Sequence, residues 1–133
     1  LQAVHSARNG YAPTGMYGAN DKDRSMDIRS DEEAFETQRH PFVREHPETG
    51  RKGLFGCAGY IIGFVGLDDD EGLPLLYDLI QWQGREEFRY SHAWEADMLV
   101  MWDNRSVLHR ATGGYDGYDR LLHRTTIAAW DGA

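Results

Sequence analysis

The sequence contains a single cysteine, Cys57, so no disulfide can form within the chain. A lone thiol is typical of a reducing compartment, which predicts a cytoplasmic protein. No apolar run approaches the ~20 residues that a membrane-spanning helix needs. The first residues also lack the pattern of a signal peptide. These absences argue against a membrane protein and against a disulfide-stabilised secreted domain.

Positive charge is scarce as well. The chain has 14 lysines and arginines against 22 acidic residues, a net charge of -8, which argues against binding to nucleic acid or to a membrane surface. A local pair of arginines can still bind a small anion. With 133 residues, 41% of them apolar and 27% charged, the composition predicts one globular domain with a modest core.

A starting methionine is missing too, since the chain begins at Leu1. We therefore expect a partial sequence. Residues 1–39 are polar and weakly patterned and predict an irregular or helical lead-in. Within it we expect, in order, a helix end at 1–9, a loop at 11–25 and a short helix or turn capped by Ser30 or Asp31.

Residues 40–133 have the sequence pattern of a β protein with one main helix. The helix is predicted near 72–83, because apolar residues recur there at helical spacing and Gly84 is a natural stop. Pro74 is best tolerated in a first turn, so we expect the helix to begin near Gly72 or Leu73. Strands are expected in five stretches: 40–56 as a strand, turn and strand, then 59–67, 87–94, 98–112 as a hairpin turning at 103–105, and 120–130, with a glycine-rich loop at 113–119.

These short strands, joined by tight turns, predict an antiparallel sheet or barrel with the helix packed outside. In the last strand Arg120 and Arg124 would share one face with their Cα atoms roughly 13 Å apart, which suits two anionic groups along a pocket. An arginine fork binds a carboxylate through two hydrogen bonds. A solvated edge carrying surface charges is the alternative. His109 ends the preceding strand, and a lone histidine is more often structural than a metal ligand.

Together these residues are more specific than they are separately. A metal-binding histidine and an arginine that binds a carboxylate would lie on neighbouring strands, which is the arrangement that a non-haem iron oxygenase needs. Such an enzyme holds Fe(II) by two histidines and one carboxylate of its own. The stretches "WDNRSVLHRA", "HRTTI" and "HPFVREHPETGRKGLF" closely resemble the C-terminal part of the TauD/TfdA family. These enzymes are Fe(II)- and 2-oxoglutarate-dependent dioxygenases built on a double-stranded β-helix, a jelly-roll or cupin-like barrel.

The resemblance runs from about residue 39 to residue 127 and implies specific roles. His109 matches the second iron-binding histidine. Arg120 matches the arginine that holds the distal carboxylate of 2-oxoglutarate, and Arg124 the second family arginine near the iron and the substrate anion. Residues 102–104, "WDN", are interpreted as a strand end and turn that aim His109.

The same resemblance implies Fe(II) as cofactor, with 2-oxoglutarate and O2 as cosubstrates. The reaction would be hydroxylation of a small, anionic substrate such as a sulfonate, a sulfate ester or an aryloxy acid, with release of succinate and CO2. The whole chain, 1–133, would be a single domain that forms the C-terminal part of the barrel. The primary substrate stays open, and so does the oligomeric state, a homo-oligomer of the whole protein included.

The family's first metal motif, His-x-Asp or His-x-Glu, is matched in letters only by His46-Pro47-Glu48. Pro47 and the turn residues that follow argue against metal binding there. We therefore expect the N-terminal half of the iron site to be absent from this chain and the chain alone to be inactive. Two rival hypotheses are a non-catalytic barrel remnant that binds a dicarboxylate, and a zinc hydrolase that uses His46, Glu48 and His109.

Overall fold

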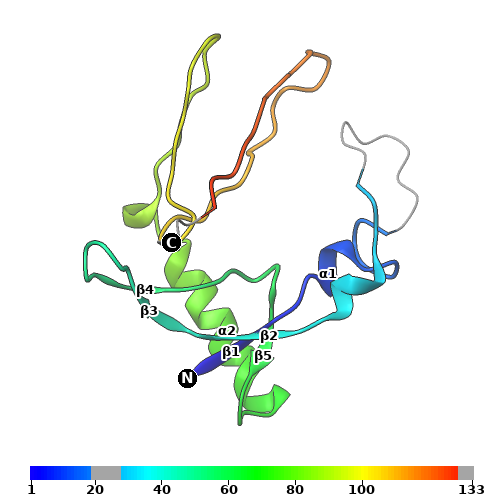
Figure 1. The fold of residues 1–133 in the computed structure, drawn as a ribbon, viewed down its shortest axis with the longest axis vertical. Helices are drawn as coiled ribbons and strands as arrows, with labels where there is room; N and C mark the ends of the chain where they lie inside the picture. Colours follow the sequence, from blue (N-terminus) through cyan, green and yellow to red (C-terminus); the bar gives the residue numbers. More distant parts are fainter. Residues whose placement is uncertain (19–27, 129–133) are drawn as a thin grey trace.

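The computed structural model describes residues 1–18 and 28–128 (Figure 1). The elements in chain order are β1 (Gln2–His5), α1 (Arg8–Tyr11), the 3-10 helix η1 (Glu32–Phe35), β2 (Gln38–Pro41), β3 (Val43–Glu45), β4 (Lys52–Leu54), β5 (Ile61–Phe64), α2 (Asp69–Gln83) and the 3-10 helix η2 (Glu86–Phe88). No helix within these ranges has the length and apolarity needed to cross a bilayer.

The strands form two antiparallel sheets, one of three strands in the order β2-β1-β5 and one made of β3 and β4. The central strand, β1, falls where a helix end was expected, so that prediction was wrong. Ala3 pairs with His40 on one side and with Phe64 on the other. Hydrogen bonding on both edges outweighs the weak local pattern of a four-residue segment. The lead-in therefore contributes to the sheet instead of only preceding it.

Two other predictions for the first half are confirmed. β3 and β4 form the hairpin expected within 40–56, closed by a hydrogen bond from the Gly50 amide to the His46 carbonyl of 2.9 Å. η1 is the expected short helix, and the Asp31 carboxylate caps it by accepting from the Glu33 amide at 2.9 Å. The loop predicted at 11–25 lies partly outside the described residues.

Helix α2 ends at Gln83 with Gly84 as its C-cap, as predicted, but begins at Asp69, three residues before Gly72. The carboxylate of Asp68 accepts a hydrogen bond from the Glu71 amide at 3.0 Å and caps the helix. Acidic residues fill the first turn, where the helix dipole favours them. Pro74 lies inside the helix, and both Pro74 and Asp70, whose carbonyl would bond to an amide at position 74, are exposed residues. Water can therefore take the place of the missing amide donor.

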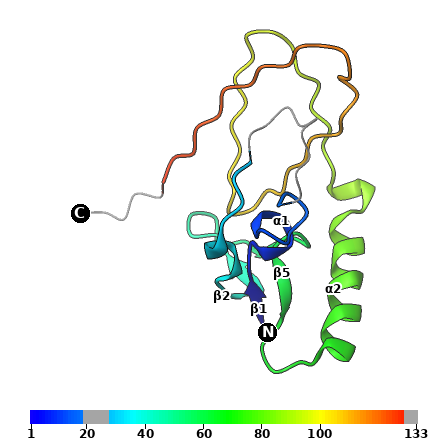
Figure 2. The ribbon, with the colours of Figure 1, turned by 90° about the vertical axis from the view of Figure 1, so that its right-hand side faces the viewer.

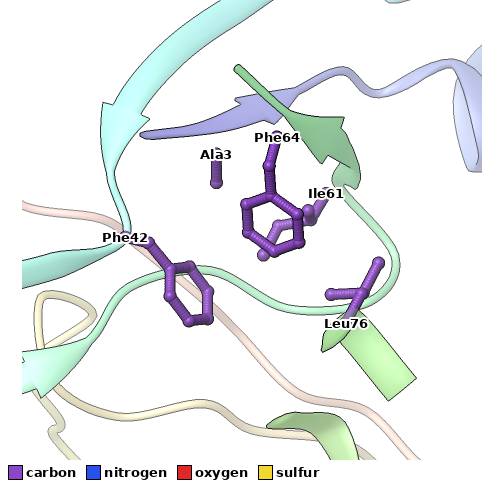
Figure 3. Close-up of a cluster of buried hydrophobic side chains, with 5 residues drawn as sticks. All are labelled: Ala3, Phe42, Ile61, Phe64 and Leu76. Carbon is purple, nitrogen blue, oxygen red and sulfur yellow. The ribbon is translucent and has the colours of Figure 1, made fainter. Parts of the chain in front are cut away.

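The core lies between the three-stranded sheet and α2. Its buried side chains are Ala3, Phe42, Ile61, Phe64 and Leu76 (Figure 3). The rings of Phe42 and Phe64 meet edge to face with their centroids 5.5 Å apart. Leu76 packs against this cluster from the helix, which lies beside β5 (Figure 2).

The second half departs from expectation. The described residues 89–128 contain no strand, although strands were predicted at 87–94, in the 98–112 hairpin and at 120–130. Two long excursions instead extend away from the sheet and helix (Figures 1 and 2). The first excursion precedes the turn at 103–106, and the second follows that turn and runs to residue 128. The apolar and β-branched pattern is present, but no neighbouring strand supplies backbone partners there. The turn after Asp103 and the glycine-rich loop at 113–119 are confirmed, while residues 129–133 lie outside the described part.

Candidate functional site

The three predicted site residues all lie on the second excursion and are all exposed. His109 follows the turn at 103–106, while Arg120 and Arg124 come after the glycine-rich loop. In the described part of the chain, no hydrogen bond, ion pair or ring contact joins His109 to either arginine. The predicted common face of Arg120 and Arg124 has no strand to define it here.

The His109 ring has one aromatic neighbour among the described residues, the indole of Trp102, with ring centroids 4.8 Å apart. The indole is itself fixed, because its Nε1–H donates to the Asn104 side-chain oxygen at 2.9 Å. Trp102 and Asn104 thus flank Asp103 and order the segment that leads to His109. The turn expected at "WDN" is confirmed, but the strand end expected there is not, since the described residues 89–128 contain no strand. Its role in aiming His109 stays a prediction.

A polar network joins this turn to the β3–β4 hairpin. His46 Nε2 lies 3.0 Å from Asp103 Oδ2. Arg105 donates to both Asp103 oxygens through Nε, at 2.9 and 3.0 Å, and to Glu48 Oε1 through a terminal nitrogen at 3.0 Å. We call His46, Glu48, Asp103 and Arg105 the turn clamp, because these four side chains connect two turns that are 57 residues apart.

The charges of the turn clamp stabilise one another. Hydrogen bonds from the Arg105 side chain, and then from His46, hold the pKa of the Asp103 carboxyl well below its usual range. The carboxylates of Asp103 and then Glu48 raise the pKa of Arg105 above its usual value. Asp103 is therefore ionised at neutral pH and accepts from two side chains and from the Arg105 backbone amide at 2.8 Å.

The geometry of the turn clamp overturns the zinc-hydrolase hypothesis. His46 Nδ1 accepts from the backbone amides of Glu48 and Thr49, both at 3.3 Å, while Nε2 faces Asp103, so neither nitrogen is available to a metal. Within residues 1–18 and 28–128, no group of three or more His, Cys, Asp or Glu side chains could hold a metal ion. His109 is thus a single ligand candidate here, not a complete iron site.

The remaining contacts of the predicted residues are local. The Arg120 guanidinium lies over the ring of Tyr115, 5.0 Å from its centroid, which gives this exposed cation an aromatic partner.

His5 and His40 form a separate pair on the sheet, where their rings meet edge to face with centroids 5.0 Å apart. Burial, followed by the charge of His40, lowers the pKa of His5. That pair is part of the packing against Phe55 and is remote in sequence from the excursion.

Sequence reasoning missed the turn clamp. It considered His46 and Glu48 only as metal ligands, in a false iron motif or in a zinc site, and did not assign Arg105 a role. The available signal was charge complementarity between two turns, "HPET" and "DNR", each rich in polar side chains. That signal does not reveal that turns 57 residues apart meet, because a single sequence carries no information on which loops are neighbours.

Comparison with known proteins gives the family. The model of the family described as "Taurine catabolism dioxygenase TauD, TfdA family" matches residues 1–126. The match includes His109, Arg120 and Arg124.

Among curated relatives, the alpha-ketoglutarate-dependent 2,4-dichlorophenoxyacetate dioxygenase of Cupriavidus pinatubonensis is 38% identical over 126 residues, which cover 95% of this chain and 41% of the relative. The (S)-phenoxypropionate/alpha-ketoglutarate-dioxygenase of Sphingobium herbicidovorans is 36% identical over 66% of this chain and 30% of its own length. An alkylsulfatase of Acinetobacter baylyi is 35% identical over 71% of this chain and 29% of its own length. The chain therefore spans about two fifths or less of these relatives, and it belongs to the TauD/TfdA family.

Proposed function

We propose that this chain is the C-terminal part of an Fe(II)- and 2-oxoglutarate-dependent dioxygenase. The whole protein would hydroxylate a small, anionic organic substrate and release succinate and CO2. The observation that carries this proposal is the family match over residues 1–126, which contains every predicted site residue. The names of the relatives point to aryloxy acids and alkyl sulfates as substrate classes, and the family description points to sulfonates such as taurine.

Each site residue has a chemical role in this proposal. His109 would bind Fe(II) through an imidazole nitrogen, with the other two ligands supplied by a part of the whole protein outside these 133 residues. Arg120 would hold the distal carboxylate of 2-oxoglutarate, and Arg124 would face the anion nearer the iron. The iron, when bound, supplies the activation of O2, whereas these residues supply binding and orientation.

The fold proposed for the whole protein is a jelly-roll barrel in which 1–133 forms part of a single domain. Segments 98–102, 106–112 and 120–130 would then pair as strands. Support comes from their apolar, β-rich patterns and from the exposure of large apolar side chains in the described part of these segments. The single thiol and the negative charge further support a cytoplasmic enzyme that binds neither nucleic acid nor membrane.

The test is succinate formation by the whole protein in the presence of Fe(II), 2-oxoglutarate, ascorbate and one candidate substrate of each class. We expect iron-dependent succinate, its loss in His109→Ala and an increased KM for 2-oxoglutarate in Arg120→Leu. His123→Ala, a change at another exposed histidine, should retain activity. The 133-residue chain alone should form no succinate. Iron-independent product, or full activity of His109→Ala, would refute the assignment.

One observation favours a second candidate, a non-catalytic dicarboxylate-binding protein. The described residues combine two arginines that are four positions apart in the sequence, Arg120 and Arg124, with no three-ligand metal group. This candidate predicts that the whole protein binds 2-oxoglutarate in calorimetry, with loss of binding in Arg120→Leu, but forms no succinate under any metal condition. The same assay therefore separates the two functions.

A further inference from the structure

The hydrogen bonds of the turn clamp define which ring nitrogen of His46 acts as the donor. Because His46 Nδ1 accepts from the amides of Glu48 and Thr49 at 3.3 Å, the ring proton lies on Nε2, which donates to Asp103 at 3.0 Å. The His46 side chain is only 13% exposed, whereas Asp103 is 35% exposed. A largely buried donor with a defined tautomer is thus aimed at one carboxylate oxygen.

The carboxylate of Asp103 also organises its own turn. The carboxylate accepts from the backbone amide and the guanidinium of Arg105. The backbone carbonyl of Asp103 accepts from the amides of Ser106 and Val107 at 3.1 and 2.9 Å. Arg105 returns to Glu48 in the first turn at 3.0 Å. The contacts form a closed cycle, so a shift of either turn breaks at least two charge-assisted hydrogen bonds.

The turn held in this way carries His109. Trp102, directly before Asp103, contacts the His109 ring, and the chain leaves the turn at Val107, two residues before His109. The described structure gives this excursion no strand pairing. The turn clamp and the contact of Trp102 with His109 therefore link the hairpin to the segment that carries the His109 imidazole.

We propose that His46 is a positioning residue, which fixes the 103–106 turn through Asp103 and thereby sets the orientation of the His109 ring. This inference rests on the proposed function for its meaning, because it is as an iron ligand that His109 requires such placement. A metal ligand is held in productive geometry by neighbours whose own rotamers are locked by hydrogen bonds. His46, which belongs to the false metal motif His46-Pro47-Glu48, would thus help to hold the metal ligand His109 without binding the metal itself.

The first test uses the whole protein without metal and NMR spectra of its histidine and tryptophan side chains. His46→Phe keeps a ring of similar size but removes the Nε2 donor. We expect the ring protons of His109 to lose the ring-current shift from Trp102 and to move toward the positions of an exposed histidine. His46→Gln, which retains an N–H donor, should restore part of the shift, and the matched control His123→Phe should leave it unchanged.

Asp103→Asn provides a second, nearly isosteric variant, and far-UV circular dichroism shows whether each variant has folded. Asp103→Asn should shift the His109 signals in the same direction as His46→Phe. Unchanged His109 and Trp102 signals in folded His46→Phe or Asp103→Asn would overturn the proposal.

A second measurement separates this inference from the proposed function. In the whole protein, His46→Phe should raise the Fe(II) concentration that gives half-maximal succinate formation about 10-fold or more, with the KM for 2-oxoglutarate within about twofold of wild type. Iron-dependent turnover that is insensitive to His46→Phe refutes the positioning role alone. A His109 shift in a protein whose wild type needs no iron refutes the proposed function alone.

Discussion

The imidazole of His46 and the carboxylate of Asp103 lie within 3.0 Å of each other and join the β3–β4 hairpin to the turn that precedes His109. The hairpin is ordered by its own ladder and by the packing of Phe42 in the core. The turn after Asp103 has no ladder of its own. This hydrogen bond therefore attaches the segment that carries the site residues to the ordered hairpin.

The titration of Asp103 should report the turn clamp directly. Arg105, and to a smaller extent His46, lowers its pKa below the ordinary value of 3.8. A depressed pKa means that the ionised clamp stabilises the fold at every pH above 3.8, and that this contribution is lost as the pH falls from 3.8 toward the folded-state pKa. By carboxyl-carbon NMR, Asp103 should remain ionised at pH 3.

Arg105→Ala should raise the titration midpoint of Asp103 more than His46→Phe does, because the Arg105 hydrogen bonds are the larger cause. Asp116→Asn, in the glycine-rich loop, is the control and should leave the midpoint unchanged. An Asp103 carboxyl that titrates near 3.8 in the wild type would contradict the network.

Local signals in the sequence predicted much of the first half. The Asp31 cap, the turn in 46–50 and the stop at Gly84 depend on side-chain and backbone chemistry within a few residues. Helix α2 begins before the position that Pro74 predicts, because the Asp68 side chain caps it. On an exposed helix face, water can satisfy the carbonyl that Pro74 leaves free, so the cap determined the start.

Features that depend on distant partners were not predictable. β1 became a strand because β2 and β5 supply hydrogen bonds on both edges. Residues 98–102 did not, because none of the strands in the described part of the chain pairs with them. A β pattern indicates only that a segment can pair, and not what it pairs with. The contact of His46 with Asp103 likewise depends on a partner that is distant in the sequence. The identity of His109, Arg120 and Arg124 as candidates came from motif resemblance, which records chemistry without requiring a local structure.

The packing of α2 on the sheet can be measured with two leucines of one helix. Leu76 is 9% exposed in the core, whereas Leu73, one turn earlier, is 53% exposed. Leu76→Ala should lower the free energy of unfolding by about 2–5 kcal/mol, through lost burial and the cavity left behind. Leu73→Ala should change it by about 0.5 kcal/mol or less. Urea unfolding followed by circular dichroism provides the comparison, and equal effects would contradict the described orientation of the helix.

Gly56 is required by two independent features. Its φ is +116°, and a Cβ built there would lie 2.6 Å from His5 Cε1 and 2.9 Å from Ile61 Cδ1. Gly56→Ala should therefore destabilise the fold by about 1–3 kcal/mol from backbone strain alone, and by more if His5 cannot move. Gly53→Ala is the matched control in β4, because nothing lies within 4 Å of its added Cβ. Urea midpoints that fall equally in both variants would exclude the packing of Gly56 against His5 as the cause.

Exposed apolar side chains on the excursions should make the 133-residue chain associate with itself. Leu99, Met101 and Ile127 are exposed by 85, 82 and 86%. Large exposed apolar surface marks an interaction or aggregation site. We expect binding of the dye ANS and an apparent mass above that of a monomer in light scattering. Replacing these three residues by serine should reduce both effects more than serine at Leu1, Val43 and Leu73 does. A monomeric wild type without ANS binding would contradict this expectation.

The stacking of Arg120 on Tyr115 predicts a specific effect on cosubstrate binding. A cation over an aromatic ring at an exposed site is worth about 0.5–1 kcal/mol, which corresponds to about a 2- to 5-fold change in affinity. If Arg120 holds the distal carboxylate of 2-oxoglutarate, Tyr115 helps to order its guanidinium, 5.0 Å away. Tyr115→Leu in the whole protein should raise the KM for 2-oxoglutarate by that factor, whereas Tyr115→Phe, which keeps the ring, should not. Tyr118→Leu, at a tyrosine of the same loop that is 80% exposed, should also leave the KM unchanged, and an equal rise in both leucine variants would show that the loop, and not the stacking, controls binding.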